Sequence, residues 1–539
     1  MTGIIRRVLF YAAVGLAAPT VRAGDAPPVD PPPGPDARFY LATRSMPEYV
    51  ERDARGIALW AAVQSFYRAR DYRLAWIEDG RLSAEAEGVA RIVAWASSDG
   101  LDGERYRIDL APRAVAAAFN GAPESDADAV QDVQLTYVFL KYAADMTGRF
   151  DPKAAGPFWL TQPRPLDLAS WLEHAVRSRR APDVFTALSP THPVYEALKT
   201  ALARYRRIER DGGWDALPAR LALRWGRRDP MVVLLRQRLA AEDDDLTATA
   251  SASSADVYDR PLVEAVKRFQ RRHGVAPSGL LDAATFAELN VPVQARIRQI
   301  ELNLERWRWL RSDLGRRHVI VNIPSFQLTA YEDTRAAVTM KVVTGRLDSP
   351  TPVLGNDMTS VIFRPYWNVP PTIAEDEIIP VVLRDPGYLR RHNMELVSGQ
   401  IRQRPGASNA LGLVKFVFPN AFGVYLHDTP DEGLFARPRR AFSHGCIRVE
   451  KPEALARWVL RDLPQWTPAA IQSAMRSGRE RSLALREPIP VYVIYQTVGR
   501  GEDAAVCFWP DVYGHDRAQM PLLPAPALGP TAAPSLASE

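Results

Sequence analysis

The hydrophobic periodicity of this chain changes near residue 316, and the change separates two kinds of structure. Before residue 316 the apolar residues recur at helical spacing, as they do in the run that ends at Tyr142. After it, short runs rich in β-branched and aromatic residues alternate with turns, over residues 318–323, 326–331 and 336–343. Two helices near residues 452–463 and 468–476 and a last strand at 490–496 complete this second part. The sequence therefore predicts a multidomain α+β chain whose β-rich domain spans residues 316–500.

The first 23 residues have the layout of a secretory signal peptide. Arg6 and Arg7 precede an apolar run over residues 8–18, and small residues lead up to Ala23. The run is too short for a comfortable membrane span, although an uncleaved anchor remains an alternative. Residues 24–37 are rich in proline and predict an extended tether. We therefore expect an exported, periplasmic protein.

The charge of the chain argues against a nucleic-acid partner. The formal charge is +5, and removal of the signal peptide would take Arg6, Arg7 and Arg22 with no acid, leaving +2. No cluster of basic residues is interleaved with aromatic residues. We expect no nucleic-acid binding.

Cysteine is scarce, and one of the two cysteines has chemically suggestive neighbours. Residues 441–449 read Ala-Phe-Ser-His-Gly-Cys-Ile-Arg-Val, and His427 lies sixteen residues before Ser443. An imidazole within reach can take the proton of the Cys446 thiol, and the thiolate then attacks. Gly445 has no Cβ beside the sulfur, so backbone N–H groups of Gly445 and Cys446 can point at an oxyanion. The alternative is that Cys446 is a small buried hydrophobe and His444 a core histidine.

The preceding residues place His427 on a strand. Residues 415–428 form two strand-like runs joined by a turn at Pro419 and Asn420. A period of two puts Tyr425 and His427 on one face. A loop after His427 can then fold back and bring the Cys446 segment beside it.

This pattern, a histidine followed after fifteen residues by Ser-His-Gly-Cys, a hydrophobic residue and Arg, resembles the catalytic signature of the L,D-transpeptidase (YkuD) family. Residues 343–346, 349–353 and 365–371 also resemble segments of that catalytic domain. The resemblance covers about residues 39–513 and points to the large, multidomain periplasmic branch of the family. Many members carry Asn where this chain has Arg448, which leaves the role of Arg448 open.

The resemblance also suggests how the rest of the chain is divided. Residues 38–225 would be an α-helical scaffold domain, 293–315 a connecting helix and 372–410 a segment that caps the substrate. Residues 226–292, with Val266-Lys267-Arg268-Phe269-Gln270 followed by Gly274, Gly279, Asp282 and Thr285, resemble a small helical peptidoglycan-binding domain that grips glycan or braces the enzyme. An acidic insertion at 242–259 is expected to be a solvated loop and not a calcium site. We expect a terminal hairpin over residues 501–519 and a disordered tail over 520–539.

The resemblance implies a cysteine acyltransferase of cell-wall biogenesis that helps to maintain cell shape. Cys446 would attack a tetrapeptide stem of peptidoglycan, and a diaminopimelate amine would resolve the thioester into a 3→3 cross-link. His427 would be the base, with His444 as second choice or as a group that orients the thiol. Neither a metal nor an organic cofactor is required, and carbapenem-type β-lactams would acylate Cys446.

The remaining site predictions leave alternatives open. Ser443 and Arg448 would shape the cysteine loop or hold a substrate carboxylate, and Tyr425 would contact substrate. Trp367 and Asn368 stand at the entrance to the capping segment, as substrate contacts or as a core Trp and a turn Asn.

Two other functions remain compatible with the sequence. Water in place of the amine would make the protein an L,D-carboxypeptidase, and the motif does not separate the two reactions. A non-catalytic wall-binding scaffold would instead join Cys446 and Cys507 in a disulfide, which export permits.

Overall fold

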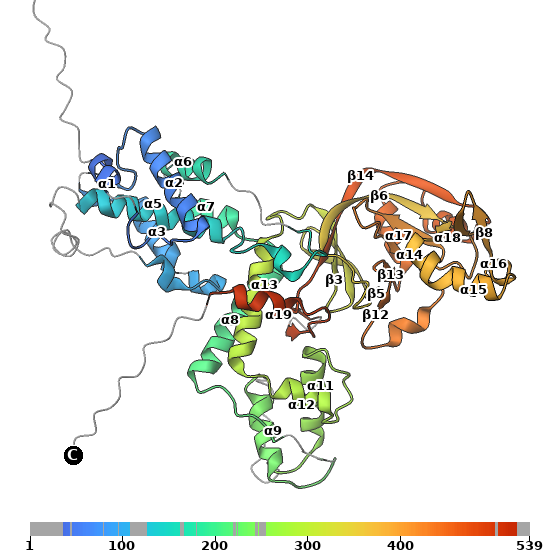
Figure 1. Cartoon of the computed structure of the whole chain (residues 1–539). Coiled ribbons are helices and arrows are strands. Elements are labelled where there is room, and N and C mark those ends of the chain that lie inside the picture. The colour runs from blue at the N-terminus through green and yellow to red at the C-terminus, as the bar shows by residue number, and fades with distance from the viewer. Residues whose placement is uncertain are drawn as a thin grey trace, which may run out of the picture.

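The computed structural model describes residues 36–43, 46–78, 80–94, 96–107, 127–161, 167–178, 181–218, 223, 225–242, 246, 255–501 and 505–524. The predicted signal peptide, most of the tether and much of the acidic insertion lie outside the described residues. Figure 1 shows three bodies, in which N-terminal helices, a helical unit of residues 231–289 and a β-rich domain meet around α13.

The N-terminal helices share one core. They are α1 (Arg38–Thr43), α2 (Ala54–Ala69), α3 (Ala84–Ala94), α5 (Ala127–Asp145), α6 (Leu168–Ser178) and α7 (Ala181–Leu188), with the short pair β1 (Ile77–Glu78) and β2 (Arg81–Leu82). Buried α5 residues such as Leu135 and Phe139 lie at the centre of this core. Asp53 and Ser83 accept N–H bonds at the starts of α2 and α3, as expected of N-cap residues.

The helices α8 (Pro193–Arg210) and α13 (Val293–Arg308) pack against each other and against the β-rich domain. Their shared core includes Leu202 and Ile300 together with Tyr492 of the sheet. Glu305 on α13 is buried and forms ion pairs with Arg149 at 2.9 Å and Arg308 at 2.7 Å. Residues 193–210, which the sequence assigns to the scaffold domain, thus extend from it as α8 and pack against the connecting helix α13.

A small unit is built from α9 (Met231–Ala240), α11 (Arg260–Arg272) and α12 (Ala283–Leu289). These helices lie where the sequence predicted them, and Leu235, Phe269 and Leu289 are buried between them. The His273 ring stacks on Phe508 near the C-terminus, with centroids 5.4 Å apart. The unit is therefore braced against the C-terminal part of the chain.

The β-rich domain is one sheet with the strand order β12-β5-β13-β11-β10-β6-β14-β3-β4. Its strands are β3 (Arg317–Asn322), β4 (Gln327–Glu332), β5 (Arg335–Gly345), β6 (Leu354–Phe363), β10 (Val414–Val417), β11 (Leu426–His427), β12 (Ala441–Ser443), β13 (Ile447–Val449) and β14 (Arg481–Ile494). β4 also pairs with β5, so the order closes on itself and only β12 stands outside the ring. The helices α17 (Pro452–Leu460) and α18 (Pro468–Arg476) contribute Trp458 and Ile471 to its core.

The predicted capping segment is a folded unit with a small core of its own. It comprises α14 (Pro371–Ile373), the π-helical turn η6 (Ala374–Ile378), α15 (Ile379–Arg384), α16 (Tyr388–Arg391), β8 (Met394–Val397) and β9 (Gln400–Gln403). β7 (Trp367–Asn368) pairs with β9 and joins the segment to the sheet domain. Val369, Ala374, Ile378 and Ile401 are buried within it.

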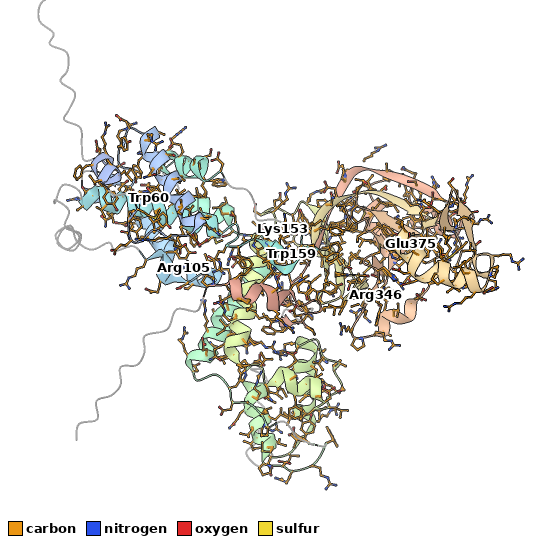
Figure 2. All side chains as sticks on the ribbon, viewed as in Figure 1. Trp60, Arg105, Lys153, Trp159, Arg346 and Glu375 are labelled. Carbon is orange, nitrogen blue, oxygen red and sulfur yellow. The ribbon has the colours of Figure 1, made fainter. Side chains whose placement is uncertain are left out.

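A segment from the N-terminal half enters the core of the β-rich domain. Trp159 forms a bridge to Val353, and the Leu160 N–H and Val353 N–H groups donate to the facing carbonyls at 2.8 Å. Figure 2 places Trp159 where the N-terminal helices meet the sheet. Trp159 is buried against Trp309 and Tyr495. The sequence did not predict this insertion.

Residues 498–524 form regular structure that the prediction only partly anticipated. The hairpin of β15 (Val498–Arg500) and β16 (Val506–Phe508) begins before residue 501, and α19 (His515–Gln519) follows it. Residues 520–524 of the predicted disordered tail include η8 (Met520–Leu522) and are held because Arg298 donates to the carbonyls of Leu523 and Pro524. No helix in the described part of the chain has the length and apolar character needed to cross a membrane.

Candidate active site

The Cys446 turn is fixed by its own hydrogen bonds. It joins β12 to β13, and both strands flank β5. Gly445 has a φ of +108°, in the left-handed region that favours glycine. The Ser443 hydroxyl donates to the Cys446 carbonyl at 2.5 Å and accepts the Gly445 N–H at 3.1 Å. The buried Thr351 hydroxyl donates to the Gly445 carbonyl at 2.8 Å, so the turn is also anchored from outside.

These bonds change the expected oxyanion donors. We expected the N–H groups of Gly445 and Cys446 to be available, but the Gly445 N–H is engaged by Ser443 because the turn folds back on that hydroxyl. The Cys446 N–H has no acceptor among the described residues. In this conformation Ser443 and Gly445 hold the shape of the turn, and Cys446 supplies the free donor.

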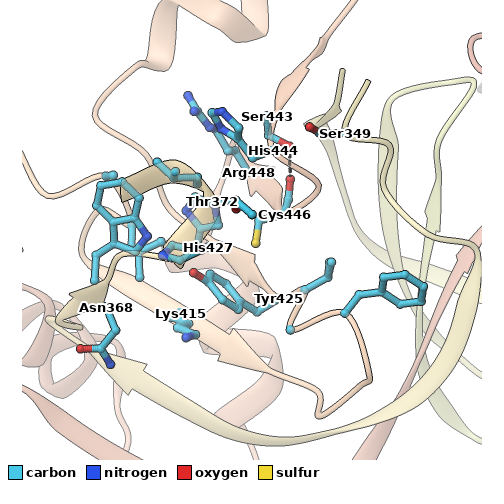
Figure 3. Close-up of a pocket in the computed structure, with 18 of the residues that line it drawn as sticks. Ser349, Asn368, Thr372, Lys415, Tyr425, His427, Ser443, His444, Cys446 and Arg448 are labelled. Carbon is cyan, nitrogen blue, oxygen red and sulfur yellow. Dashed lines mark hydrogen bonds between the residues drawn. The ribbon is translucent and has the colours of Figure 1, made fainter. Parts of the chain in front are cut away.

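Strand pairing places His427 beside the Cys446 turn. β11 runs parallel to β13, with Leu426 opposite Ile447 and His427 opposite Arg448. Val424 and Leu426 point into the core, whereas Tyr425 and His427 line a cavity with Cys446, as the period of two predicted. Figure 3 shows the Cys446 sulfur directed toward His427 and Tyr425.

The protonation state of His427 follows from its contacts. His427 Nδ1 lies 2.6 Å from the Asp428 carbonyl oxygen, which only accepts, so Nδ1 carries the proton and Nε2 is an acceptor. Burial lowers the pKa of His427 to about 3, and the charges of Arg448 and Lys415 act in the same direction. The imidazole is therefore neutral and able to accept a proton at neutral pH.

Burial also raises the pKa of the Cys446 thiol. Hydrogen bonds from the backbone N–H and the hydroxyl of Tyr425, together with the charges of Lys415 and Arg448, oppose that rise. The resting pair is thus a neutral thiol and a neutral imidazole. Such a pair needs a proton transfer to His427 as the sulfur attacks.

Lys415 is a member of the site that the sequence argument did not single out. It lies on β10, directly opposite His427 on β11, and its Nζ stands 3.6 Å from the centroid of the Tyr425 ring. The sequence did contain a signal for this residue, because Lys415 is a lysine within an apolar run, on the strand face that carries the site.

His444 turns away from the thiol and toward the capping segment. Its Nε2 lies 2.6 Å from Glu377 Oε1 on the π-helical turn, and Arg346 lies 3.7 Å from the same oxygen. This contact gives His444 a structural role that the sequence could not suggest, because Glu377 lies 67 residues away.

The predicted binding residues surround one cavity of about 600 Å³. Trp367 and Asn368 line it from β7, where Trp367 also packs on the core of the capping segment. Arg448 lines it as well, and its guanidinium is paired with Asp431 at 3.0 Å. A cavity of this size accommodates a peptide-sized ligand. All the site residues predicted from the sequence therefore lie in or around this cavity.

Cys446 and Cys507 are not joined by a disulfide. Cys446 lies in the cavity, whereas Cys507 is buried in the hairpin at β16. The disulfide expected of a purely structural protein is not formed.

Comparisons with known proteins agree with this architecture. Residues 316–480 match the model of the L,D-transpeptidase catalytic domain (YkuD), residues 61–202 that of a scaffold domain, and residues 228–289 that of a "Putative peptidoglycan binding domain". Residues 316–480 are thus similar to the L,D-transpeptidase catalytic domain (YkuD), which confirms the resemblance inferred from the signature.

Individual relatives add detail. A protein of Haemophilus influenzae named "Putative L,D-transpeptidase" is 33% identical over 220 residues, which cover 37% of this chain and 44% of the relative, so the match spans less than half of that protein. Among solved structures, L,D-transpeptidase 3 from Mycobacterium tuberculosis is 17% identical with a TM-score of 0.19, over 33% of this chain and 61% of that one. An L,D-transpeptidase from Mycobacterium smegmatis is 13% identical with a TM-score of 0.19, over 33% and 58% of the two chains.

Proposed function

We propose that this protein is a peptidoglycan L,D-transpeptidase that forms 3→3 cross-links through a Cys446 thioester, with His427 as the general base. The observation that carries the proposal is the arrangement of a free thiol and a neutral histidine in one cavity. The histidine's Nδ1 proton is tied to the Asp428 carbonyl, which leaves Nε2 to accept the thiol proton.

The first half of the reaction transfers the acyl group to the enzyme. Cys446 Sγ attacks the carbonyl of the third residue of a tetrapeptide stem while His427 takes the thiol proton. The Cys446 N–H stabilises the developing oxyanion. The C–N bond then breaks, His427 returns the proton to the leaving amine, and the terminal D-alanine departs.

The second half resolves the thioester. The side-chain amine of a diaminopimelate residue in an acceptor stem attacks the same carbonyl and gives a proton to His427. The C–S bond breaks, the thiol is regenerated and a new amide joins the two stems. The same intermediate would accept a lipoprotein lysine or a D-amino acid, and water in its place would make the reaction an L,D-carboxypeptidase.

Two further properties belong to the proposal. Carbapenem-type β-lactams would open on Cys446 and remain as covalent adducts, because the same nucleophile faces the cavity. The N-terminal 23 residues would direct export to the periplasm, where the substrate lies, and the helical unit of residues 231–289 would contact the wall or brace the enzyme.

Incubation of the purified protein with disaccharide-tetrapeptides, followed by mass spectrometry, tests the proposal. We expect cross-linked dimers and free D-alanine from the unmodified protein and neither from Cys446→Ala. Tripeptide without dimer would identify the carboxypeptidase, and unchanged substrate would reject both enzymes.

A further inference from the structure

The positively charged groups that line the cavity are paired with carboxylates, with one exception, and Asp376 lines the cavity without an ion pair in the described part of the chain. Arg448 lies 3.0 Å from Asp431, and Arg346 lies 2.5 Å from Asp348. His444 is bound to Glu377. Lys415 alone among these groups has no carboxylate within 4 Å in the described part of the chain. The acidic group that influences it most is the Cys446 thiol, followed by Glu480, and a Glu480 oxygen already accepts the Tyr366 N–H at 2.8 Å.

The contacts of Lys415 do not compensate for its partial burial. Nζ contacts the face of the Tyr425 ring, which stabilises the cation. Removal of an ammonium group from water costs more free energy than such a contact returns, unless the group is also paired and hydrogen-bonded. No hydrogen-bond acceptor for Nζ lies among the described residues. A cation held in this way beside a nucleophile is complementary to an anionic group of the ligand.

We propose that Lys415 binds the terminal carboxylate of the donor stem, the carboxylate of the residue that leaves when Cys446 is acylated. This inference rests on the proposed function and names the substrate group that one side chain recognises. Tyr425 and Cys446 line the same cavity, and Lys415 Nζ lies 3.6 Å from the centroid of the Tyr425 ring. The carboxylate of the leaving residue lies roughly 3.5 Å beyond the scissile carbonyl in an extended chain, which suits a cation about one tyrosine ring away.

A cation fixed at this position would also discriminate between donor stems of different length. In a tetrapeptide the carboxylate follows the scissile bond by one residue. In a pentapeptide it lies one residue further, again by roughly 3.5 Å, and a neutral amide faces Lys415 instead. Lys415 thus selects stems that end immediately after the bond to be broken.

Binding and turnover test the proposal separately. Calorimetry in a Cys446→Ala background measures the Kd of two tetrapeptides, one with a free terminal carboxylate and one with a terminal amide. Both retain the carboxylate of the diaminopimelate residue, so the comparison isolates the terminal group. We expect Lys415→Met to weaken the free acid about 10- to 100-fold and the amide by less than about threefold. Lys415→Arg should retain most of the preference, and Lys451→Met, a surface lysine on another face, is the matched control.

The outcomes separate this inference from the proposed function. If Lys415→Met weakens both peptides equally, or neither, Lys415 does not bind the terminal carboxylate and the inference is wrong. If neither Kd changes, but Lys415→Met shifts the pH profile of Cys446 alkylation by iodoacetamide in the protein that retains Cys446, Lys415 acts on the thiol instead. Turnover is measured separately on the protein that retains Cys446. A Kd that depends on the terminal carboxylate, without turnover, would contradict the proposed transpeptidase function but support Lys415 as a carboxylate-binding residue.

Discussion

The floor and the roof of the cavity are built in different ways. The floor is the part of the sheet that carries Tyr425, His427 and Cys446, and register and turn hydrogen bonds hold these residues over a large core. The roof is the capping segment, which has a small core of its own and reaches across the cavity through Glu377. The half-exposed contact of Glu377 with His444 and Arg346 contributes little stability. We infer that the floor determines the chemistry and that the roof controls what reaches the thioester.

The largest effect is expected when the nucleophile of the floor is removed. Cys446→Ala should abolish cross-linking and covalent capture of a carbapenem while leaving the fold intact, because the side chain is small and its turn is held by Ser443 and Thr351. Intact-protein mass spectrometry detects the adduct. The matched control is Cys507→Ala, which should still be acylated. If loss of Cys507 removed the adduct instead, the site would be misassigned.

Substitution of the two histidines tests the two regions separately, because His427 belongs to the floor and His444 contacts the roof. His427→Ala should slow acylation by roughly 10²- to 10⁴-fold, the usual contribution of a general base. His444→Ala should slow it only a few-fold, because His444 faces Glu377. Single-turnover acylation rates decide between them, and a larger loss in the His444 variant would transfer the role of base to that residue.

The pH dependence of acylation tests the neutral thiol–imidazole pair of the floor. Burial lowers the pKa of His427 to about 3, so the imidazole stays unprotonated at pH 5 and the rate should change little between pH 5 and pH 7. A histidine with the ordinary pKa of 6.5 would be about 97% protonated at pH 5, and the acylation rate would fall roughly 25-fold between pH 7 and pH 5. Stopped-flow acylation by a carbapenem gives the profile. A steep fall between pH 7 and pH 5 would contradict the buried, neutral base.

Removal of the roof should change the products more than the acylation step. With residues 372–410 replaced by a short Gly/Ser linker, a small β-lactam should still acylate Cys446. Water would reach the thioester more easily, since closure of a site suppresses such side reactions, and the ratio of tripeptide to dimer should rise several-fold. The ratio is measured by mass spectrometry on a variant first shown to be folded and acylated. An unchanged ratio would exclude a lid function for the capping segment.

The smallest effect concerns the contact between the two regions. Glu377→Gln removes the charge that faces His444 and Arg346, both partly exposed, so at most about fivefold should be lost from cross-linking. Glu375→Gln, on the same turn, is the control. Acylation should not change. A strong loss of acylation would show that the roof also positions the nucleophile.

The sequence predicted those parts of the site that depend on local pattern. The period of two placed Tyr425 and His427 on one face, and the glycine before Cys446 predicted an unusual turn. The sequence did not predict the hydrogen-bond partner of the Gly445 N–H, because the Ser443 hydroxyl can be directed toward several groups. Contacts between distant segments were also missed: Trp159 in the sheet, Glu377 on His444, and α8 against α13 depend on tertiary packing and leave no local signature.

The position of β14 has a consequence for how the protein is made. This strand lies between β3 and β6, yet the chain encodes it after the Cys446 turn and beyond residue 480, where the match to the catalytic-domain model ends. Since synthesis runs from the N-terminus, Cys446 leaves the ribosome while β3 and β6 still lack their shared neighbour. Until β14 arrives, both are open sheet edges and the core beneath the cavity is unfinished. A chain interrupted before residue 481 would carry the thiol without the assembled site. We therefore expect prematurely terminated chains to be inactive.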